Sequence, residues 1–453
     1  MKTVLKDYQK KGVRKIEHFN GRALLADEMG LGKTFQALQW LKNHPEIKIA
    51  IVVCPAHLKW VWQAEARKHV DIKSVILSGQ KPPKVRIKSN PRLIIINYNI
   101  LQYWLKYLIA LKPQLLIPDE GHFIKSRKAK RTKAIKELSK KIPYVIVISG
   151  TPLTNRPSEL WTTLNLIKPK EFSSFFSYAF RYCKPTRTPW GWNYKGSSNL
   201  AELHKKLKST MMIRRLKKDV LKELPDKIRQ VVPLEIEDRK EYQSAVDNFI
   251  KWLKKKSATK AQRAKKAQQL VKLGYLKRLA AELKMKAVFD WIDSFLEESN
   301  EKIVIYAIHK KIITAIHDKY KKISVVLDGS TSPRKRKLAI TTFQKNKKVR
   351  MFIGNIKAAG TGITLTAAST LAFVEIDWTP HSQVEDRIHR ITQKNICMIY
   401  YLVAKGTIEE KLCLILQEKQ EVIAQTLDGN IETNKLDIFT ELEKSLKKQR
   451  SKK

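Results

Sequence analysis

The chain has 453 residues, of which 43% are hydrophobic, so it can form a large buried core and two or three domains. Ninety Lys and Arg against 42 Asp and Glu give a net charge of +48, which predicts a polyanionic partner such as nucleic acid. The alternative explanation is a general abundance of Lys, which would spread the charge evenly along the chain. No apolar run approaches the roughly 20 residues that span a bilayer. With no signal peptide and no CxxC pair, we expect an intracellular protein without membrane, disulfides or zinc, cytoplasmic in a bacterium or virus and nuclear in a eukaryote.

The first chemical motif is a glycine-rich loop, residues 27–34, which reads DEMGLGKT. Such a loop before a helix directs backbone N–H groups and the positive helix end at one point, where a polyphosphate can bind. The expected nucleotide-binding residues are Gly30, Gly32, Lys33 and Thr34. The lysine would reach the β- and γ-phosphates, and the threonine hydroxyl would ligate Mg²⁺. The strict pattern has glycine at position 27, so an ordinary turn is the alternative, but an apolar strand at 22–26 and a helix at 35–43 favour the phosphate loop.

An acidic pair, Asp119 and Glu120, follows the apolar run at residues 115–117. Alone it would be interpreted as a solvated surface feature. Together with the upstream phosphate loop, it supplies the two carboxylates that hold Mg²⁺ and orient the attacking water. We therefore expect Lys33, Asp119 and Glu120 to be catalytic, with Thr34 and Asp119 as metal ligands and ATP as the nucleotide.

Short apolar runs alternate with amphipathic helical stretches in two parts of the chain, which predicts two tandem α/β lobes with parallel sheets flanked by helices. The strand candidates are residues 49–54, 93–97, 115–117, 144–148, 303–306, 324–327, 351–354, 370–375 and 398–403. The expected divisions are a first ATP-binding lobe at 1–169, a helical protrusion with return to that lobe at 170–230, a basic helical linker at 231–286, a second lobe at 287–430 and a basic tail at 431–453.

The segment between the lobes is first aromatic and then basic. Residues 251–280 carry 11 Lys or Arg and no acid. We interpret residues 251–284 as a duplex-binding clamp, with a solvated helix face as the alternative. Trp190 and Trp192 are expected to pack the insertion against its lobe, and stacking on a nucleic-acid base is the other possibility.

In the second half, Arg387 and Arg390 lie three residues apart within residues 383–393, which read QVEDRIHRITQ. This spacing places both on one face of a helix. An arginine pair alone is usually a solvated surface feature. Beside the motifs of the first half, however, the two residues are candidates for arginines that contact the γ-phosphate and stabilise its transfer.

These motifs, in this order from about residue 5 to 427, resemble the Swi/Snf family of superfamily-two helicase-like ATPases. The segments that carry the resemblance are residues 5–12, 25–34, 53–56, 60–65, 149–155, 212–220, 224–225, 328–332, 359–368 and 387–390. The resemblance implies two RecA-like lobes, a contact between Gln9 and the adenine base, and Gly360 among the nucleotide-binding residues. The family itself has Asp at the position of Asp27.

Residues 302–309 and 401–410 look closest to the annealing-helicase branch of the family. Thr392, Pro118 and Asn355 depart from the usual family residues, and none of them removes a catalytic group. Pro118 costs a ladder hydrogen bond unless it ends its strand, which is where the motif puts it. We expect a compact core without accessory domains.

The resemblance implies a DNA-dependent ATPase that translocates on duplex DNA, independently of sequence, and remodels DNA or protein–DNA complexes or anneals strands. A strand-separating DNA or RNA helicase shares every ATPase motif and remains an alternative. A nucleic-acid-binding scaffold with a silent ATPase is a third reading, which the intact Lys33, Asp119, Glu120, Arg387 and Arg390 disfavour.

Overall fold

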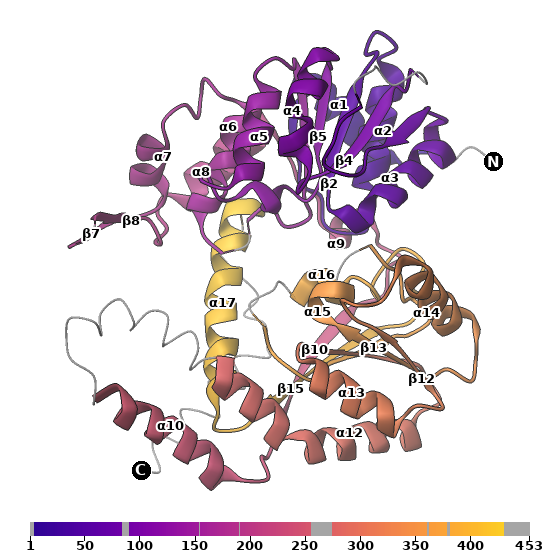
Figure 1. Ribbon diagram of the computed structural model, residues 1–453, viewed down its shortest axis with the longest axis vertical. Coiled ribbons are helices and arrows are strands. Elements are labelled where there is room, and N and C mark those ends of the chain that lie inside the picture. The colour runs from indigo at the N-terminus through magenta and orange to yellow at the C-terminus, as the bar shows by residue number, and fades with distance from the viewer. Residues whose placement is uncertain are drawn as a thin grey trace. The chain divides into compact units, whose positions relative to one another are not determined.

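A computed structural model describes residues 4–83, 90–153, 155–189, 191–254, 274–359, 362–377 and 381–429. The described chain divides into two units, one made of residues 4–222 with 419–429 and the other of residues 223–418 (Figure 1). Within these residues, none of the helices combines the length and apolar character that crossing a bilayer requires.

The first unit is built on a seven-stranded sheet in the order β3-β4-β2-β5-β6-β1-β9, with every pair parallel. Its strands are β1 Arg22–Leu25, β2 Ala50–Cys54, β3 Ser74–Ile76, β4 Leu93–Asn97, β5 Leu115–Pro118, β6 Tyr144–Ile148 and β9 Met212–Ile213. Successive residues of β1 alternate between two cores, Ala23 in one and Leu24 in the other. Because both faces are buried, the strands read as continuous apolar runs.

Helices cover both faces of this sheet. Residues of α1 Asp7–His18, α2 Lys33–Asn43 and α3 Lys59–Glu65 join one core. Residues of α4 Leu101–Ala110, α5 Lys130–Ser139, α6 Trp161–Ile167, α7 Phe175–Tyr182 and α8 Leu200–Thr210 join the other. The short helix α9 Lys217–Val220 follows β9, and β7 Thr186–Thr188 pairs with β8 Gly191–Asn193 as an antiparallel hairpin.

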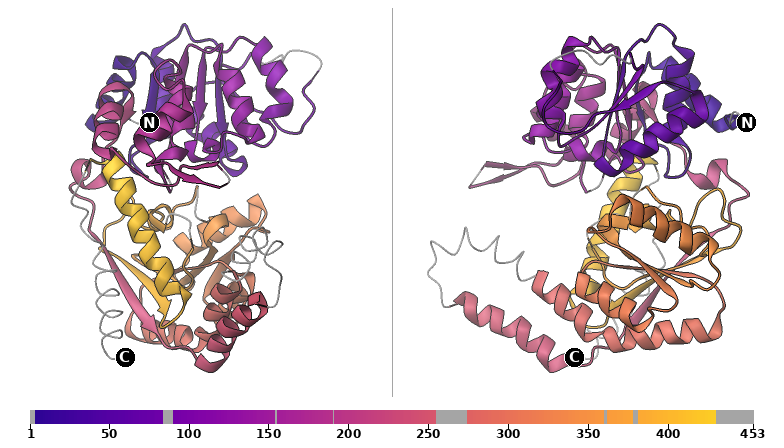
Figure 2. Two further views of the ribbon diagram at one scale, coloured as in Figure 1. Left: turned by 90° about the vertical axis from the view of Figure 1, so that its left-hand side faces the viewer. Right: turned by 45° about the vertical axis from the view of Figure 1, so that its right-hand side comes forward.

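The second unit contains a six-stranded sheet, β10-β15-β14-β11-β13-β12, whose pairs are all parallel. Its strands are β10 Lys227–Leu234, β11 Ile303–Ala307, β12 Ser324–Leu327, β13 Met351–Asn355, β14 Thr370–Phe373 and β15 Cys397–Ala404. Helices that belong wholly or partly to this unit include α10 Arg239–Lys254, α12 Met285–Glu298, α13 Lys310–Lys319, α14 Pro333–Lys345, α15 Ile356–Ala359, α16 His381–Glu385 and α17 Ile408–Leu427, and residues 274–283 are also helical. Figure 2 shows the sheet of each unit among its helices, which confirms the predicted fold class of two parallel α/β lobes.

The end of α17 belongs to the first unit. Leu427 is part of the core that lies against α4 to α8, and the backbone oxygen of Thr426 lies 3.2 Å from the His204 ring. The C-terminal part of α17 is therefore packed within the first unit.

Candidate nucleotide-binding site

The glycine-rich loop joins β1 to α2. Gly30 and Gly32 have φ angles of +87° and +73°, a left-handed conformation that glycine adopts at little cost, and Gly32 is the N-cap of α2. The helix begins at Lys33, so Lys33 and Thr34 occupy its first turn. This strand–loop–helix arrangement directs the N-terminus of α2 toward the loop, as an anion site requires.

The Lys33 amine lies within the loop and donates hydrogen bonds to the backbone oxygens of Asp27 at 2.8 Å and Glu28 at 3.2 Å. Burial lowers the pKa of Lys33, while the nearby carboxylates of Glu120, Asp27 and Asp119 act in the opposite direction. The amine thus stands between the loop backbone and the acidic pair, where it can reach a phosphate.

Asp119 and Glu120 directly follow β5, both buried. The Asp119 carboxylate accepts hydrogen bonds from the Trp62 indole at 2.7 Å and from the Glu120 backbone N–H at 2.9 Å, and its carbonyl accepts one from the Tyr98 hydroxyl at 2.7 Å. Burial and, next, the charge of Glu120 raise the pKa of Asp119 to about 7. Trp62 therefore orients the carboxylate, and Tyr98 holds the backbone of the same residue. Sequence reasoning placed Trp62 in segment 60–65 without this contact, and it missed Tyr98.

Gln9, on α1, lies against the same loop. Its amide accepts a hydrogen bond from the Lys6 backbone at 3.0 Å and donates one to the Leu31 carbonyl at 3.2 Å. A Cβ added to Gly32 would collide with this side chain. Gln9 is therefore held at the edge of the phosphate loop, and its contact with the adenine base stays a prediction.

Asp27, which stands where the strict pattern has glycine, is completely buried and forms an ion pair with Arg215. Arg215 binds both carboxylate oxygens of Asp27, and it also donates to the Tyr8 carbonyl and, at 2.7 Å, to the Gln36 amide oxygen. A Cβ on Gly12 would clash with Gln36 and Arg215. Asp27 thus connects the loop, through Arg215, to α1, α2 and the segment after β9.

Arg214, the neighbouring residue, contacts three other segments. It donates to the carbonyls of Ala26 at 2.8 Å and Gly150 at 3.2 Å, and its Nε donates to the Asp428 carboxylate at 2.7 Å. A Cβ on Gly150 would lie 3.2 Å from the Lys33 amine and would also collide with Met29. The end of α17 and the segment containing Gly150 therefore join the structural frame of the loop.

The two candidate arginines lie in the second unit, and the prediction that both lie on a helix is wrong. Helix α16 ends at Glu385, and the chain continues in turns such as the 3.0 Å bond from Arg387 N–H to the Val384 carbonyl. Arg390 donates to the Thr364 hydroxyl at 2.7 Å, and burial, then the charge of Arg387, lowers its pKa to about 9. The Leu365 backbone N–H donates to the Arg387 carbonyl at 2.9 Å. The two arginines are therefore held by bonds to residues 364 and 365 and not by the hydrogen bonds of a helix.

A buried ionic cluster supports this segment. The Glu385 carboxylate pairs with Lys227 at 2.8 Å and Arg229 at 2.6 Å, and the Tyr401 hydroxyl donates to it at 2.6 Å. Although burial opposes it, the two cations hold the pKa of Glu385 well below its usual range. The cluster connects β10 and β15 to the arginine-bearing turns.

The structure brings seven predicted residues together within the first unit and the arginine pair within the second. The seven are Gln9, Gly30, Gly32, Lys33, Thr34, Asp119 and Glu120. The predicted features outside the described residues are Gly360, Trp190, Thr154, residues 255–273 and the tail at 431–453.

The family assignment comes from the sequence of both units. The model of the SNF2-related domain matches residues 8–285, more than half of the chain, and the helicase conserved C-terminal domain matches residues 284–394. The chain belongs to the SNF2-related family. It is therefore an ATP hydrolase with an SNF2-type ATPase core.

Its curated relatives include two kinds of larger SNF2 protein. The chain is 34% identical over 93% of its length to SWI/SNF-related matrix-associated actin-dependent regulator of chromatin subfamily A-like protein 1 from Xenopus tropicalis, and covers 45% of that protein. It is 34% identical over 95% of its length to the DNA annealing helicase and endonuclease ZRANB3 from Homo sapiens, and covers 41% of it. The chain thus spans less than half the length of these relatives. Its similarity to the second of them agrees with the predicted resemblance to the annealing-helicase branch.

A solved structure, the Sulfolobus solfataricus SWI2/SNF2 ATPase core in complex with dsDNA, is 25% identical, with a TM-score of 0.47 and coverage of 95% of this chain and 94% of that one.

The three departures from the usual SNF2 residues have local partners. Pro118 is the last residue of β5, and the backbone N–H of the next residue, Asp119, donates to the Val53 carbonyl at 2.8 Å. The Asn355 side chain donates to the Ile308 carbonyl at 2.7 Å and accepts the backbone N–H of Lys357 at 3.0 Å. The Thr392 hydroxyl donates to that of Thr366 at 3.2 Å.

At the described end of the basic run, two cations do not fit the predicted clamp. Lys284 is fully buried and pairs with Glu409 at 2.6 Å, Lys277 pairs with Asp377 at 3.3 Å, and Arg278 bonds a carboxylate one turn ahead on its own helical segment. Lys277 and Lys284 thus serve ion pairs inside the second unit, whereas Arg278 stays 56% exposed. The clamp hypothesis therefore loses Lys277 and Lys284, and for the rest of the run it stays a prediction.

Proposed function

We propose that this protein is a DNA-dependent ATPase that translocates along duplex DNA without separating its strands, and that it remodels DNA or anneals strands. The observation that carries the proposal is the similarity, across 95% of the chain, to a protein named as a DNA annealing helicase. The net charge of +48 supports a polyanionic partner bound mainly through its phosphates.

The chemistry proposed for the first unit uses the residues gathered around the loop. The Lys33 amine and the first turn of α2 bind the ATP phosphates, and Glu120 orients the attacking water. Thr34 and Asp119 offer a hydroxyl and a buried carboxylate, oxygen donors that suit Mg²⁺. When bound, this ion neutralises charge on the β- and γ-phosphates.

Arg387 and Arg390 are proposed to stabilise the charge that develops on the transferring phosphoryl group. Arginines in this role contribute about 10³- to 10⁵-fold to turnover. Arg390→Ala should therefore lower ATP turnover by about that factor while ATP affinity changes little, since the phosphate loop stays intact. A variant with near-normal turnover would contradict this role.

The proposed function is tested by ATP turnover of the purified chain with duplex DNA, single-stranded DNA and RNA at two salt concentrations. Lys33→Ala is the control, because it removes the phosphate-binding amine. We expect stimulation chiefly by duplex or forked DNA, weakened by salt and absent from the variant. Stimulation by single strands or RNA would instead indicate a strand-separating helicase, and no turnover with any nucleic acid would favour a binding scaffold.

A further inference from the structure

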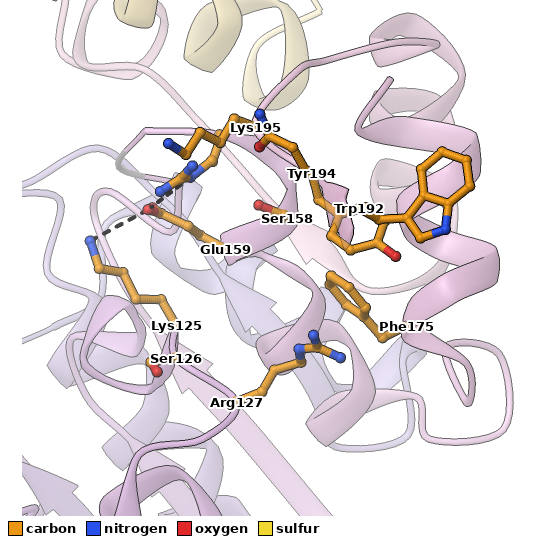
Figure 3. Close-up of a pocket in the computed structure, with 11 residues that line it drawn as sticks. Lys125, Ser126, Arg127, Ser158, Glu159, Phe175, Trp192, Tyr194 and Lys195 are labelled. Atoms are coloured by element: carbon orange, nitrogen blue, oxygen red, sulfur yellow. Dashed lines mark ion pairs between the residues drawn. The ribbon is translucent and has the colours of Figure 1, made fainter. Parts of the chain in front are cut away.

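A pocket of about 460 Å³ lies in the first unit and is not lined by any residue of the nucleotide-binding site (Figure 3). One side carries cations and the other carries aromatic rings. The residues that argue for its role are Lys125, Arg156, Lys195, Phe175, Trp192 and Tyr194. Side chains of this kind recognise a group that joins an anionic part to a flat ring.

The β7–β8 hairpin positions the aromatic side. Gly191 takes a φ of +106°, and its carbonyl accepts a hydrogen bond from the Thr188 hydroxyl at 2.6 Å, which joins the end of β7 to the start of β8. Trp192 pairs across the hairpin with Arg187. Trp192 in β8 and Tyr194, directly after the strand, both line the pocket.

The two main rings of this side differ in exposure. Phe175 is buried, with its ring in edge contact with Tyr194 at 5.2 Å and under the Arg127 guanidinium at 3.3 Å from the ring centroid. Trp192 is 47% exposed and touches Phe180 edge-on at 4.9 Å. Phe180 thus contacts the Trp192 ring, while nearly half of the Trp192 surface stays accessible to a ligand.

The cationic side carries more charge than its carboxylate neutralises. Lys125 and Arg156 share Glu159, at 3.6 and 3.8 Å, and Lys195 is exposed at the rim. With Arg127, the lining has four cations and one anion, 4 − 1 = +3. Two cations thus share one carboxylate, so the lining keeps a net positive charge that can attract a phosphate.

We propose that this pocket binds one unpaired nucleotide of a DNA strand, with its base stacked on Trp192 and its phosphate held by Lys125, Arg156 and Lys195. The inference rests on the proposed DNA-directed function and adds a preference for unpaired bases. A base within a duplex has both faces covered by its neighbours, so only an unstacked base can reach the ring. The volume falls within the range of pockets that hold small ligands.

The test measures binding of a single-stranded oligonucleotide containing 2-aminopurine to the full chain, without ATP. Trp192→Ala should weaken binding about 5- to 150-fold, the range found for one base on one aromatic ring, and Trp192→Phe should keep most of the affinity. Tyr103→Ala, which removes an aromatic ring of similar exposure, 46%, from α4, is the matched control and should bind like the wild type. Lys195→Gln should reduce the salt slope of binding by about 0.7.

Three outcomes would overturn the inference: no binding of the single strand by the wild type, equal affinities for the Trp192→Ala and Tyr103→Ala variants, or an equal loss on a blunt duplex. Displacement of the oligonucleotide by free dAMP at matched nucleotide concentration would show a free-nucleotide site and also overturn it. The proposed function fails separately, if DNA does not stimulate ATP turnover of the wild type, because the binding assay contains no ATP.

Discussion

The ion pair between Asp27 and Arg215 provides a quantitative test of how the phosphate loop is held. Arg215→Ala removes the two-pronged contact with a carboxylate that has no exposed surface, together with the bonds to the Tyr8 carbonyl and the Gln36 amide. Removing one partner of a buried pair typically costs about 3 to 5 kcal/mol, because the remaining charge is uncompensated. The Arg215 side chain is 17% exposed and Gln36 still donates to Asp27 at 3.0 Å, so we expect about 3 kcal/mol.

Two further variants distinguish the contribution of the Asp27–Arg215 ion pair from that of the other Arg215 contacts. Arg215→Lys keeps the charge but cannot bind both oxygens, and should lie between the wild type and Arg215→Ala. The double variant Asp27→Gly/Arg215→Met removes both charges and should be less destabilised than the sum of its single variants, by about 1 to 3 kcal/mol.

The assay is urea unfolding followed by tryptophan fluorescence. Seven of the ten tryptophans precede residue 223, so the signal reports chiefly on the first unit. The reasoning would be refuted if Arg215→Ala unfolded at the same urea concentration as the wild type, or if the two single costs simply added in the double variant.

Three other changes test packing and charge elsewhere in the two units. Gly121→Ala places a Cβ 2.7 Å from a valine methyl of β6 and should cost about 1 to 3 kcal/mol in urea unfolding, whereas Gly329→Ala, with open space around it, should not. Asp428→Ala leaves Arg214 without its carboxylate, which is 2.7 Å away and mostly buried, and should lower the melting temperature of the first unit through a loss of about 1 to 3 kcal/mol. Burial lowers the pKa of His381 to about 4, below the unfolded value of about 6.5, so the native state should lose stability as pH falls from 6.5 toward 4. His381→Leu should show a smaller loss in melting temperature over that interval.

The fold and the position of the loop were predictable because their signals are local. A buried parallel strand is a continuous apolar run, and a loop that opens a helix has glycines at fixed spacing. The predicted strand at residues 22–26 is observed as Arg22–Leu25, and the predicted helix at 35–43 as Lys33–Asn43. The predicted acidic pair follows β5 directly.

The contacts that hold the site were not predictable from spacing. Arg215 is 188 residues from Asp27, and Trp62 is 57 residues from Asp119. The one sequence signal for the first contact was an acid where the pattern has glycine, since a carboxylate in an apolar setting requires a cation. Helical spacing around Arg387 and Lys284 was also misleading, because tertiary contacts decide where α16 stops and which lysines are buried.

Arg214 and Arg215 act together in one further respect. Arg215 turns toward the loop and α1, whereas Arg214 turns toward Gly150 and Asp428 at the end of α17. Between them they fix four segments from distant parts of the sequence around the Lys33 amine. A loop that must present its N–H groups to a phosphate gains affinity when that shape is already fixed before binding, because less conformational entropy is then lost. The two arginines therefore explain how a loop of glycines, the residue least able to hold a shape by itself, keeps its conformation.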